Sequence, residues 1–349
     1  MSTYALISDL PVTIESLALE RLEHAVSSEF TRVTTLVSLR GGGEDGVGED
    51  VIYSAEEHDR LAELAPSLPL AGDWTLGSLS QHLERLELFR EPPEMEAFRH
   101  YRRWAFESAA LDLALRQAGT SLSAAVGRPA RPVRFVVSMR LGWEQSSDPV
   151  RRLLEVHPGT TFKLDPVPDW TPELVEELSE LGVVDSVDLK GQYKGTVVDN
   201  PADPELYRLV AEGFPDAWIE DPALTAETEP VLEPHRERIT WDAPIHSVAD
   251  VEGLPFPPRT INIKPSRFGT LQRLFDVYDY CAGRGIGMYG GGQFELGVGR
   301  GHIQYLASLF HADMPNDVAP GGYNTTPLEP SLAETPLPPA AAPTGFRWG

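Results

Sequence analysis

The chain has 349 residues, of which 41% are hydrophobic, and a formal charge of −24 from 53 acidic and 29 basic residues. This length allows two domains with a sizeable core, and so acidic a chain disfavours nucleic acid and anionic lipid as partners. Its single cysteine, Cys281, excludes an internal disulfide. No apolar run reaches the about 18 residues of a membrane span, and residues 1–10 lack the parts of a signal peptide, so we expect a cytoplasmic protein.

The first part of the chain has the pattern of an α+β domain. Residues 11–53 contain alternating and β-branched runs on both sides of a glycine-rich turn, which predicts antiparallel strands joined by a hairpin. Helical patterns follow near residues 55–64 and 79–88. The strongest helical pattern covers residues 100–118 and ends at a glycine. Its many alanines favour close packing against another element.

From residue 131 onward, short apolar runs alternate with helical patterns, several of which open with proline after an aspartate or threonine. The expected strands are residues 133–139, 160–165, 184–188, 217–220, 239–242, 260–264, 285–289 and 312–318. Eight strands with alternating helices predict an α/β fold of the (β/α)8 TIM-type barrel class. The alternative is a doubly wound open sheet, but such a sheet does not place charged residues at the ends of so many successive strands.

Four of these runs end in a charged residue, namely Asp188, Glu220, Asp242 and Lys264, at successive spacings of 32, 22 and 22 positions. The spacing is about that of one strand plus one crossover helix. Because the carboxyl ends of barrel strands gather at one mouth, three carboxylates and a lysine should converge there. Carboxylates are ligands for Mg²⁺, and a desolvated lysine near a cation can act as a base. The alternative for the three acids is that they are solvated loop residues without a metal. The alternative for Lys264 is a structural ion pair with one of these acids.

The segments FKLD, VDLKG, WIEDP, ITWDAPI, INIKPSRFG and GGQFELGVG follow one another in an order and spacing that resembles the enolase superfamily. The closest resemblance is to its muconate cycloisomerase and o-succinylbenzoate synthase branch. GVGED and the helix YRRWAFESAALDLALRQAG are similar to the family's capping domain and its junction with the barrel. The resemblance implies an α+β capping domain (1–121), a barrel catalytic domain (122–320) and a tail rich in proline and alanine (321–349) that returns to the cap.

By this resemblance Asp188, Glu220 and Asp242 correspond to the ligands of Mg²⁺, and Lys264 corresponds to the catalytic lysine on strand six. The family's shared chemistry is removal of a proton α to a carboxylate, which gives an enediolate. A divalent cation offsets the second negative charge that develops.

Two further residues are expected to bind the substrate: Glu295, which follows strand seven, and Asn262, on the strand of Lys264. The implied activity is that of an Mg²⁺-dependent lyase or isomerase acting on a small-molecule carboxylate. Dehydration of the o-succinylbenzoate synthase type, cycloisomerisation and racemisation all stay open. Assembly into a homo-oligomer is possible.

The sequence departs from the family pattern on strands two and three. Lys163 and Asp165 stand where the family has Lys-x-Lys, and strand alternation places both on one face, so Asp165 occupies the usual catalytic position. Lys190, two residues after Asp188, should turn to the same side and pair with Asp165 across the strands. Lys163, Asp165 and Lys190 therefore complete the catalytic candidates, with a structural salt bridge as the alternative for the last two.

Because the usual pair of lysines is incomplete, the alternative function is a diverged member that binds metal and a ligand with weak or no turnover. Residues 285–290 contain no histidine, which argues against the mandelate racemase branch. His302, in the following helix, is expected to have a capping or packing role.

Overall fold

The computed structural model describes residues 2–26, 30–196, 198–324 and 330–349. In the N-terminal part, strands β2 (Ser16–Ala25), β3 (Thr31–Gly41) and β4 (Glu44–Asp50) form an antiparallel sheet in the order β2-β3-β4. Gly42 and Gly43, with φ of 57° and 81°, make the hairpin between β3 and β4, as expected for a glycine-rich turn. A second pair joins β1 (Pro11–Ile14) to β5 (Gly72–Thr75).

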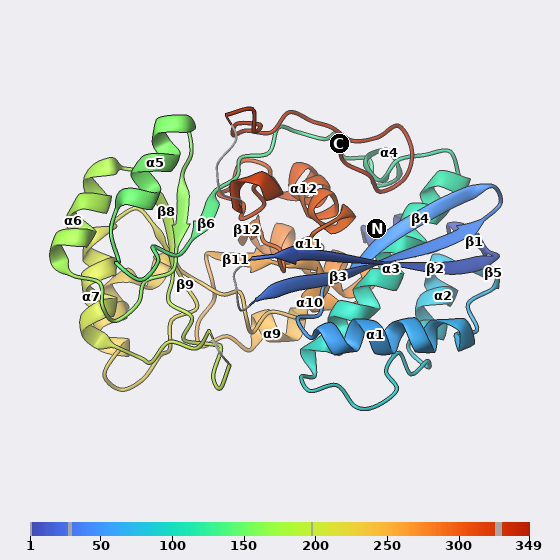
Figure 1. Ribbon diagram of the computed structural model, residues 1–349, viewed down its shortest axis with the longest axis horizontal. Helices are drawn as coiled ribbons and strands as arrows, with labels where there is room; N and C mark the ends of the chain where they lie inside the picture. Colours follow the sequence, from blue (N-terminus) through green and yellow to red (C-terminus); the bar gives the residue numbers. More distant parts are fainter. Residues whose placement is uncertain (1, 27–29, 197, 325–329) are drawn as a thin grey trace.

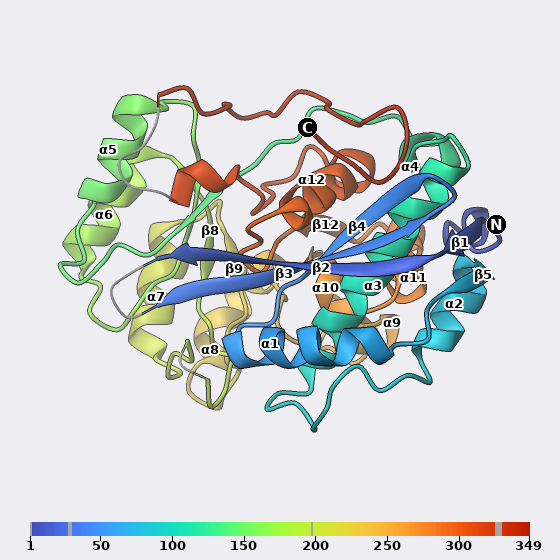
Figure 2. The same ribbon diagram turned by 45° about the vertical axis from the view of Figure 1, so that its right-hand side comes forward.

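The cap helices are α1 (Ala55–Leu64), α2 (Leu76–Leu83) and α3 (Ala97–Gln117). Figures 1 and 2 show the three-stranded sheet lying across α3. The close packing that the alanines of α3 predicted is present, because a Cβ added to Gly46 would lie 2.2 Å from the Ala109 oxygen, and one added to Gly48 would lie 2.0 Å from the Ala105 oxygen.

The larger domain is built from parallel strands. A five-stranded sheet has the order β10-β9-β8-β7-β6, and β11 pairs with β12. Its strands are β6 (Val137–Met139), β7 (Phe162–Leu164), β8 (Val184–Asp188), β9 (Trp218–Glu220), β10 (Ile239–Thr240), β11 (Thr260–Ile263) and β12 (Gly287–Gly290). The hydrogen bond from Asn262 N–H to the Trp241 oxygen, 2.9 Å, joins the two sheets.

A short helix, α4 (Leu122–Ala125), precedes β6. The helices that follow the strands are α5 (Asp148–Val156), α6 (Pro172–Leu181), α7 (Pro204–Gly213), α8 (Glu229–Leu232), α9 (Val248–Glu252), α10 (Pro265–Phe268), α11 (Leu271–Arg284) and α12 (Val298–Phe310). Figure 1 shows α5, α6 and α7 on the outer side of the five-stranded sheet. Helix α8 is short and continues as a 3-10 turn, Glu233–Arg238. Pro234 explains the change, because it has no N–H to donate to the helix.

The eighth strand, expected at residues 312–318, exists only as two isolated bridges, Asn316 with Phe135 and Asp317 with Gly291. They still close the barrel, since Asp317 N–H donates to the Gly290 oxygen at 2.8 Å. Pro315 lacks a donor for a regular ladder. The Asn316 side chain takes over part of this role by accepting from Gly290 N–H at 2.7 Å. The expected (β/α)8 class is therefore confirmed, with an incomplete last strand.

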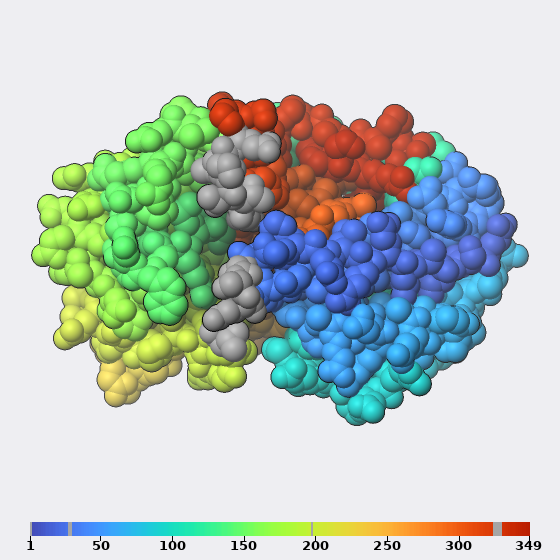
Figure 3. Space-filling model, in the orientation of Figure 1, coloured from blue at the N-terminus to red at the C-terminus, as the bar shows by residue number. Residues whose placement is uncertain are grey.

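The C-terminal tail runs along one edge of the molecule from the barrel to the cap (Figure 3). Leu337 bridges to Val133, and Phe346 N–H donates to the Asp112 carboxylate of α3 at 2.8 Å. The Phe346 ring stacks on buried His302, with centroids 4.2 Å apart. Residues 325–329 of the expected tail lie outside the described residues, and the expected limits of the three parts stay predictions. Among the described residues, no helix is both long and apolar enough to cross a membrane.

Candidate active site

The four charged strand ends lie together at one mouth of the barrel. Asp188 and Glu220 are the last residues of β8 and β9, Asp242 lies just beyond β10, and Lys264 directly follows β11. All four are buried, which is unusual for charged side chains without partners. Because water does not screen these buried charges, each needs an oppositely charged or hydrogen-bonding group close by.

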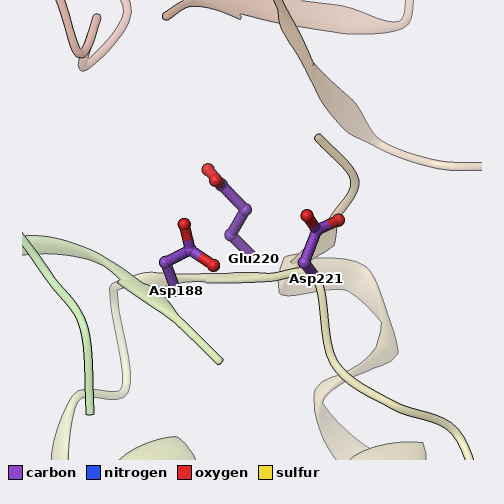
Figure 4. Close-up of side chains that lie close together, drawn as sticks. All are labelled: Asp188, Glu220 and Asp221. Carbon is purple, nitrogen blue, oxygen red and sulfur yellow. The ribbon is translucent and has the colours of Figure 1, made fainter. Parts of the chain in front are cut away.

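The closest group of carboxylates among the described residues is Asp188, Glu220 and Asp221, each of which has one oxygen within 4.8 Å of an oxygen of the other two. Figure 4 shows the three side chains on adjoining strand ends. Asp221 is absent from the set expected from the sequence, where Asp221-Pro222 signalled only a turn, and Asp242 lies outside this closest group.

Asp221 has a left-handed backbone, with φ of 49°. Its two carboxylate oxygens accept the backbone N–H groups of Asp242 and Ala243, both at 2.8 Å. Asp221 thus ties the end of β9 to the segment that carries Asp242.

Lys163, on β7, lies between two of the carboxylates. Its Nζ is 3.0 Å from an Asp188 oxygen and also contacts Glu220. Burial by itself lowers the pKa of Lys163, but Asp188 and Glu220 outweigh burial and raise that pKa well above its usual range. Lys163 is therefore a permanent cation that supports the carboxylates.

The carboxylates remain crowded in spite of Lys163. Burial, with Asp188 and Asp242 nearby, raises the pKa of Glu220 to about 8 against the opposing effect of Lys163. Burial and the same two neighbours raise the pKa of Asp221 to about 7. Acids that resist ionisation because they are buried together are stabilised by an added cation. These carboxylates could therefore hold a metal ion.

Asp242 has two unlike oxygens. Its Oδ2 receives Lys264 Nζ at 2.8 Å, the Tyr193 hydroxyl at 2.8 Å and an Arg267 nitrogen at 3.3 Å. Its Oδ1 is buried without a hydrogen-bond partner in the described part of the chain. Burial raises the pKa of Asp242, but Arg267 and Lys264 outweigh it and lower that pKa below its usual range. An ionised oxygen without a donor is a fitting ligand for a cation.

The cross-strand pair expected between Asp165 and Lys190 is present. Lys190 Nζ lies 3.7 Å from Asp165 Oδ1 and also contacts Asp188, while Arg140 Nε lies 3.2 Å from the other Asp165 oxygen. Lys190 has a left-handed backbone, with φ of 55°, because it lies in the turn after β8. The ion pairs of Asp165 therefore involve Lys190 and Arg140 rather than Lys264 or Lys163.

The two residues expected to bind substrate lie on β11 and after β12. Asn262 Nδ2 donates to Glu220 at 3.4 Å, and Asn262 Oδ1 has no hydrogen-bond partner among the described residues. Glu295 accepts Gln293 N–H at 2.5 Å and lies 3.2 Å from an Arg300 nitrogen. The loop that carries Glu295 borders the site, since a Cβ added to Gly291 would lie 2.8 Å from Lys264 Cε.

Sequence reasoning missed three further polar residues of the mouth besides Asp221: Tyr193, Arg267 and Tyr289, which donates to Glu220. Arg267 stands in INIKPSRFG, three residues after Lys264. This spacing could have indicated Arg267 as a residue of the site, because residues three apart on a helix lie on the same face.

Comparison with known proteins gives two family matches. Residues 129–325 match the model described as "Domain of unknown function (DUF8230) C-terminal domain", and residues 5–125 match the corresponding N-terminal domain. Among curated proteins, an N-succinylamino acid racemase of Amycolatopsis sp is 29% identical over 339 residues, with 85% of this chain and 84% of that protein covered. An o-succinylbenzoate synthase of Geobacillus stearothermophilus is 29% identical over 229 residues, with 62% of this chain and 58% of that protein covered.

Solved structures share the architecture. A dipeptide epimerase from Methylococcus capsulatus complexed with Mg ion superposes with a TM-score of 0.70 at 19% identity, covering 96% of this chain and 99% of that one. A muconate cycloisomerase from Pseudomonas fluorescens gives 0.66 at 17% identity, covering 97% and 96%. These likenesses concern the fold. The chain is thus similar to proteins of the kind that the sequence motifs resembled, and it belongs to the DUF8230 family.

Proposed function

We propose that this chain is an Mg²⁺-dependent lyase or isomerase that removes a proton α to the carboxylate of a small-molecule substrate. Its relatives include a racemase and o-succinylbenzoate synthases, whose names imply proton abstraction next to a carboxyl group. The observation that carries the proposal is the juxtaposition of Lys264 with Asp242, whose second oxygen is buried and has no hydrogen-bond partner within the described residues.

Asp188, Glu220 and Asp242 are the residues that would hold the ion, and their carboxylate oxygens suit Mg²⁺. Asp221 supports them by fixing the backbone of Asp242. When bound, the ion supplies positive charge to the oxygens of the substrate carboxylate while negative charge develops there.

Lys264 is the proposed acid or base. It is 7% exposed at the mouth, so its amine can reach a substrate while staying largely desolvated. Its Nζ accepts the α-proton after releasing one of its own, and it can return a proton to the substrate or its leaving group. When Lys264 is engaged with the substrate, Arg267 still offsets the charge of Asp242, and the Tyr193 hydroxyl still donates a hydrogen bond to it.

Lys163 and Lys190 keep Asp188 ionised and in place, since each contacts its carboxylate. Asp165 holds Lys190 from the opposite side. In this arrangement one lysine, Lys264, transfers protons, and Lys190 supplies the positive charge that a strand-two lysine would otherwise bring. Asn262 and Glu295 are proposed to contact the substrate beyond its carboxylate.

The second candidate is a diverged member that binds a metal ion and a ligand with weak or no turnover. Two observations favour it: Lys264 is held in an ion pair by Asp242, and Asp165 stands at the strand-two position where the family has a lysine. A lysine that stays paired cannot take a proton, so the two candidates differ in whether Lys264 is released during binding.

The experiment that separates them is isotope exchange. The protein is incubated in D₂O with Mg²⁺ and a pooled set of carboxylic acids that includes N-succinylamino acids, and mass spectrometry detects α-deuteration or loss of water. Exchange that requires both Mg²⁺ and Lys264, and that survives Lys194→Ala at an exposed lysine, supports the enzyme. Absence of exchange across the pool, with Mg²⁺ still bound, supports the diverged binder.

A further inference from the structure

Arg32, on strand β3 of the cap, is fully buried, and its guanidinium donates hydrogen bonds to four backbone oxygens. Its guanidinium donates to the Gln293 oxygen at 2.8 Å and to the Phe294 oxygen at 3.1 Å, both in the loop after β12. It also donates to Val51 and Ile52 of the cap, at 2.8 and 2.7 Å. Burying a guanidinium costs free energy. Its hydrogen bonds to these carbonyl groups offset part of that cost and fix the carbonyl groups in place.

Glu49, on the neighbouring strand β4, makes the complementary contacts. Its carboxylate accepts the N–H groups of Leu296 at 2.7 Å, Gly297 at 3.0 Å and Gly299 at 2.8 Å. Burial and nearby Glu295 raise its pKa, while the Gly299 N–H opposes that shift. The carboxylate thereby satisfies donors at the start of α12 that the helix itself leaves unpaired.

The loop between these two sets of contacts has a strained backbone, which contacts from outside the loop must stabilise. Phe294 has a left-handed backbone, with φ of 57°, a conformation that a bulky residue keeps only when its surroundings impose it. The glycines that follow allow the cap to approach closely. A Cβ on Gly297 would lie 2.8 Å from Leu36 of β3, and one on Gly299 would lie 2.9 Å from Glu49 Oε2.

The held loop carries Glu295. Its Oε2 lies 3.2 Å from Arg300, but it has no hydrogen-bond partner in the described part of the chain. The same loop borders the site through Gly291, beside Lys264 and Asn262.

We propose that Arg32 and Glu49 are positioning residues: one binds the loop's carbonyls and the other its N–H groups, and together they set Glu295 at the barrel mouth for contact with the substrate. The cap thus shapes the catalytic domain's own loop, in addition to covering it. We call the contacts of Arg32 and Glu49 with residues 293–299 the clamp. The contact between Glu295 and substrate rests on the proposed function, whereas the clamp does not.

The test uses two variants of the full chain, Glu49→Gln and Gly299→Ala. The first keeps the side-chain shape and removes the charge. The second crowds both carboxylate side chains, because the added Cβ would lie 2.7 Å from Glu295 Cγ and 2.9 Å from Glu49 Oε2. Glu20→Gln, an exposed glutamate on β2, is the matched control. Hydrogen–deuterium exchange is followed in peptides covering residues 291–300, with α7 as a distant reference.

In both variants the amides of residues 296–299 should exchange at least about tenfold faster, with α7 and the control unchanged, because a lost acceptor exposes those amides to local opening. Mn²⁺ affinity should stay within about twofold, since Glu49 does not contact the carboxylate cluster. Unchanged loop exchange in both variants, or an equal rise throughout the molecule, overturns the clamp.

With an active substrate from the isotope experiment, the KM of Glu49→Gln should rise about tenfold while kcat changes less than about threefold, because Glu295 contacts substrate away from the transferred proton. Gly299→Ala is followed by loop exchange only, since its added Cβ would also displace Glu295. Faster loop exchange with unaltered KM would show a merely structural contact and overturn positioning. If the wild-type protein exchanges no substrate proton, the proposed function is wrong. The amide exchange rates of the loop then test the clamp by themselves.

Discussion

Lys264 Nζ lies 2.8 Å from Asp242 Oδ2, while Asp242 Oδ1 is buried without a hydrogen-bond partner in the described part of the chain. One oxygen of this carboxylate therefore pairs with a lysine, and the other receives no hydrogen bond from the described residues. A divalent ion bound to Asp242 would repel the Lys264 ammonium group, and this competition can be measured.

Replacing Lys264 with alanine should tighten Mn²⁺ binding by about tenfold while abolishing any proton exchange. Unit charges about 4 Å apart interact by about 4 kcal/mol at an effective dielectric constant of about 20, and relaxation of the site reduces this value. Isothermal titration calorimetry measures the affinity. Weaker Mn²⁺ binding in this variant would mean that Lys264 and the ion do not compete for Asp242.

Adding Mg²⁺ should raise the melting temperature if the ion binds as proposed, because its carboxylate ligands are assembled only in the folded chain. At a concentration one hundred times Kd the expected stabilisation is about 2.7 kcal/mol. Thermal unfolding with and without Mg²⁺ measures it, and Asp242→Asn should remove most of the effect. A shift that persists in this variant would place the ion elsewhere.

Changing Lys190 to alanine should lower the free energy of unfolding by about 3 kcal/mol, since Asp188 and Asp165 lose a largely buried cation. Mg²⁺ should restore part of this loss by supplying charge to Asp188. Chemical denaturation gives both values, with Lys194→Ala as the control. If Lys190→Ala folds and binds metal normally but loses turnover, its role is catalytic rather than structural.

Stability should fall as the pH drops below about 6.5, in part because of His302. Burial lowers the pKa of this histidine to about 3 in the folded protein, so the unfolded chain, with an ordinary pKa of about 6.5, binds the proton more readily. The contribution is complete above pH 6.5 and is lost toward pH 3, amounting to about 2 kcal/mol between pH 7.5 and 5.0.

His302→Phe, which can retain the stack on Phe346, should reduce the pH dependence of the free energy of unfolding by that amount. Urea denaturation at the two pH values measures the difference between variant and wild type. An identical pH dependence in both proteins would contradict the assignment.

Gly48→Ala should destabilise the cap by about 3 kcal/mol, because the new Cβ would lie 2.0 Å from the Ala105 oxygen of α3. Gly283→Ala is the matched control. Its position in α11 has no heavy atom within 4 Å, and helix propensity favours alanine there by about 0.5–1 kcal/mol. Equal effects of the two substitutions would show that α3 does not need the glycine.

Local patterns in the sequence predicted much of the fold. The runs ending at Asp188 and Glu220 are strands that end there, and the helix expected at residues 55–64 is α1. These elements follow from apolar periodicity and terminal signals, which need only neighbouring residues. The motif series also predicted the capped barrel and the superfamily.

Other features depend on contacts between distant segments. The strand expected at residues 312–318 forms only bridges, because Pro315 lacks a donor and the Asn316 side chain replaces backbone hydrogen bonds. Helix α12 begins at Val298, where Glu49 of the distant strand β4 accepts the Gly299 N–H group. Neither the contact of Asn316 with Gly290 nor that of Glu49 with α12 can be read from neighbouring residues in the sequence.

The residue types of the site were readable from the sequence, but their pairing was not. Alternation and strand ends determined that Asp188, Glu220, Asp242 and Lys264 face one mouth. Only the tertiary structure decided that Asp221 joins the closest carboxylates and that Arg267 shares Asp242 with Lys264. The reason is physical: a side chain's direction follows from its own strand, whereas the distance between two charges depends on how separate strands, turns and the cap pack together.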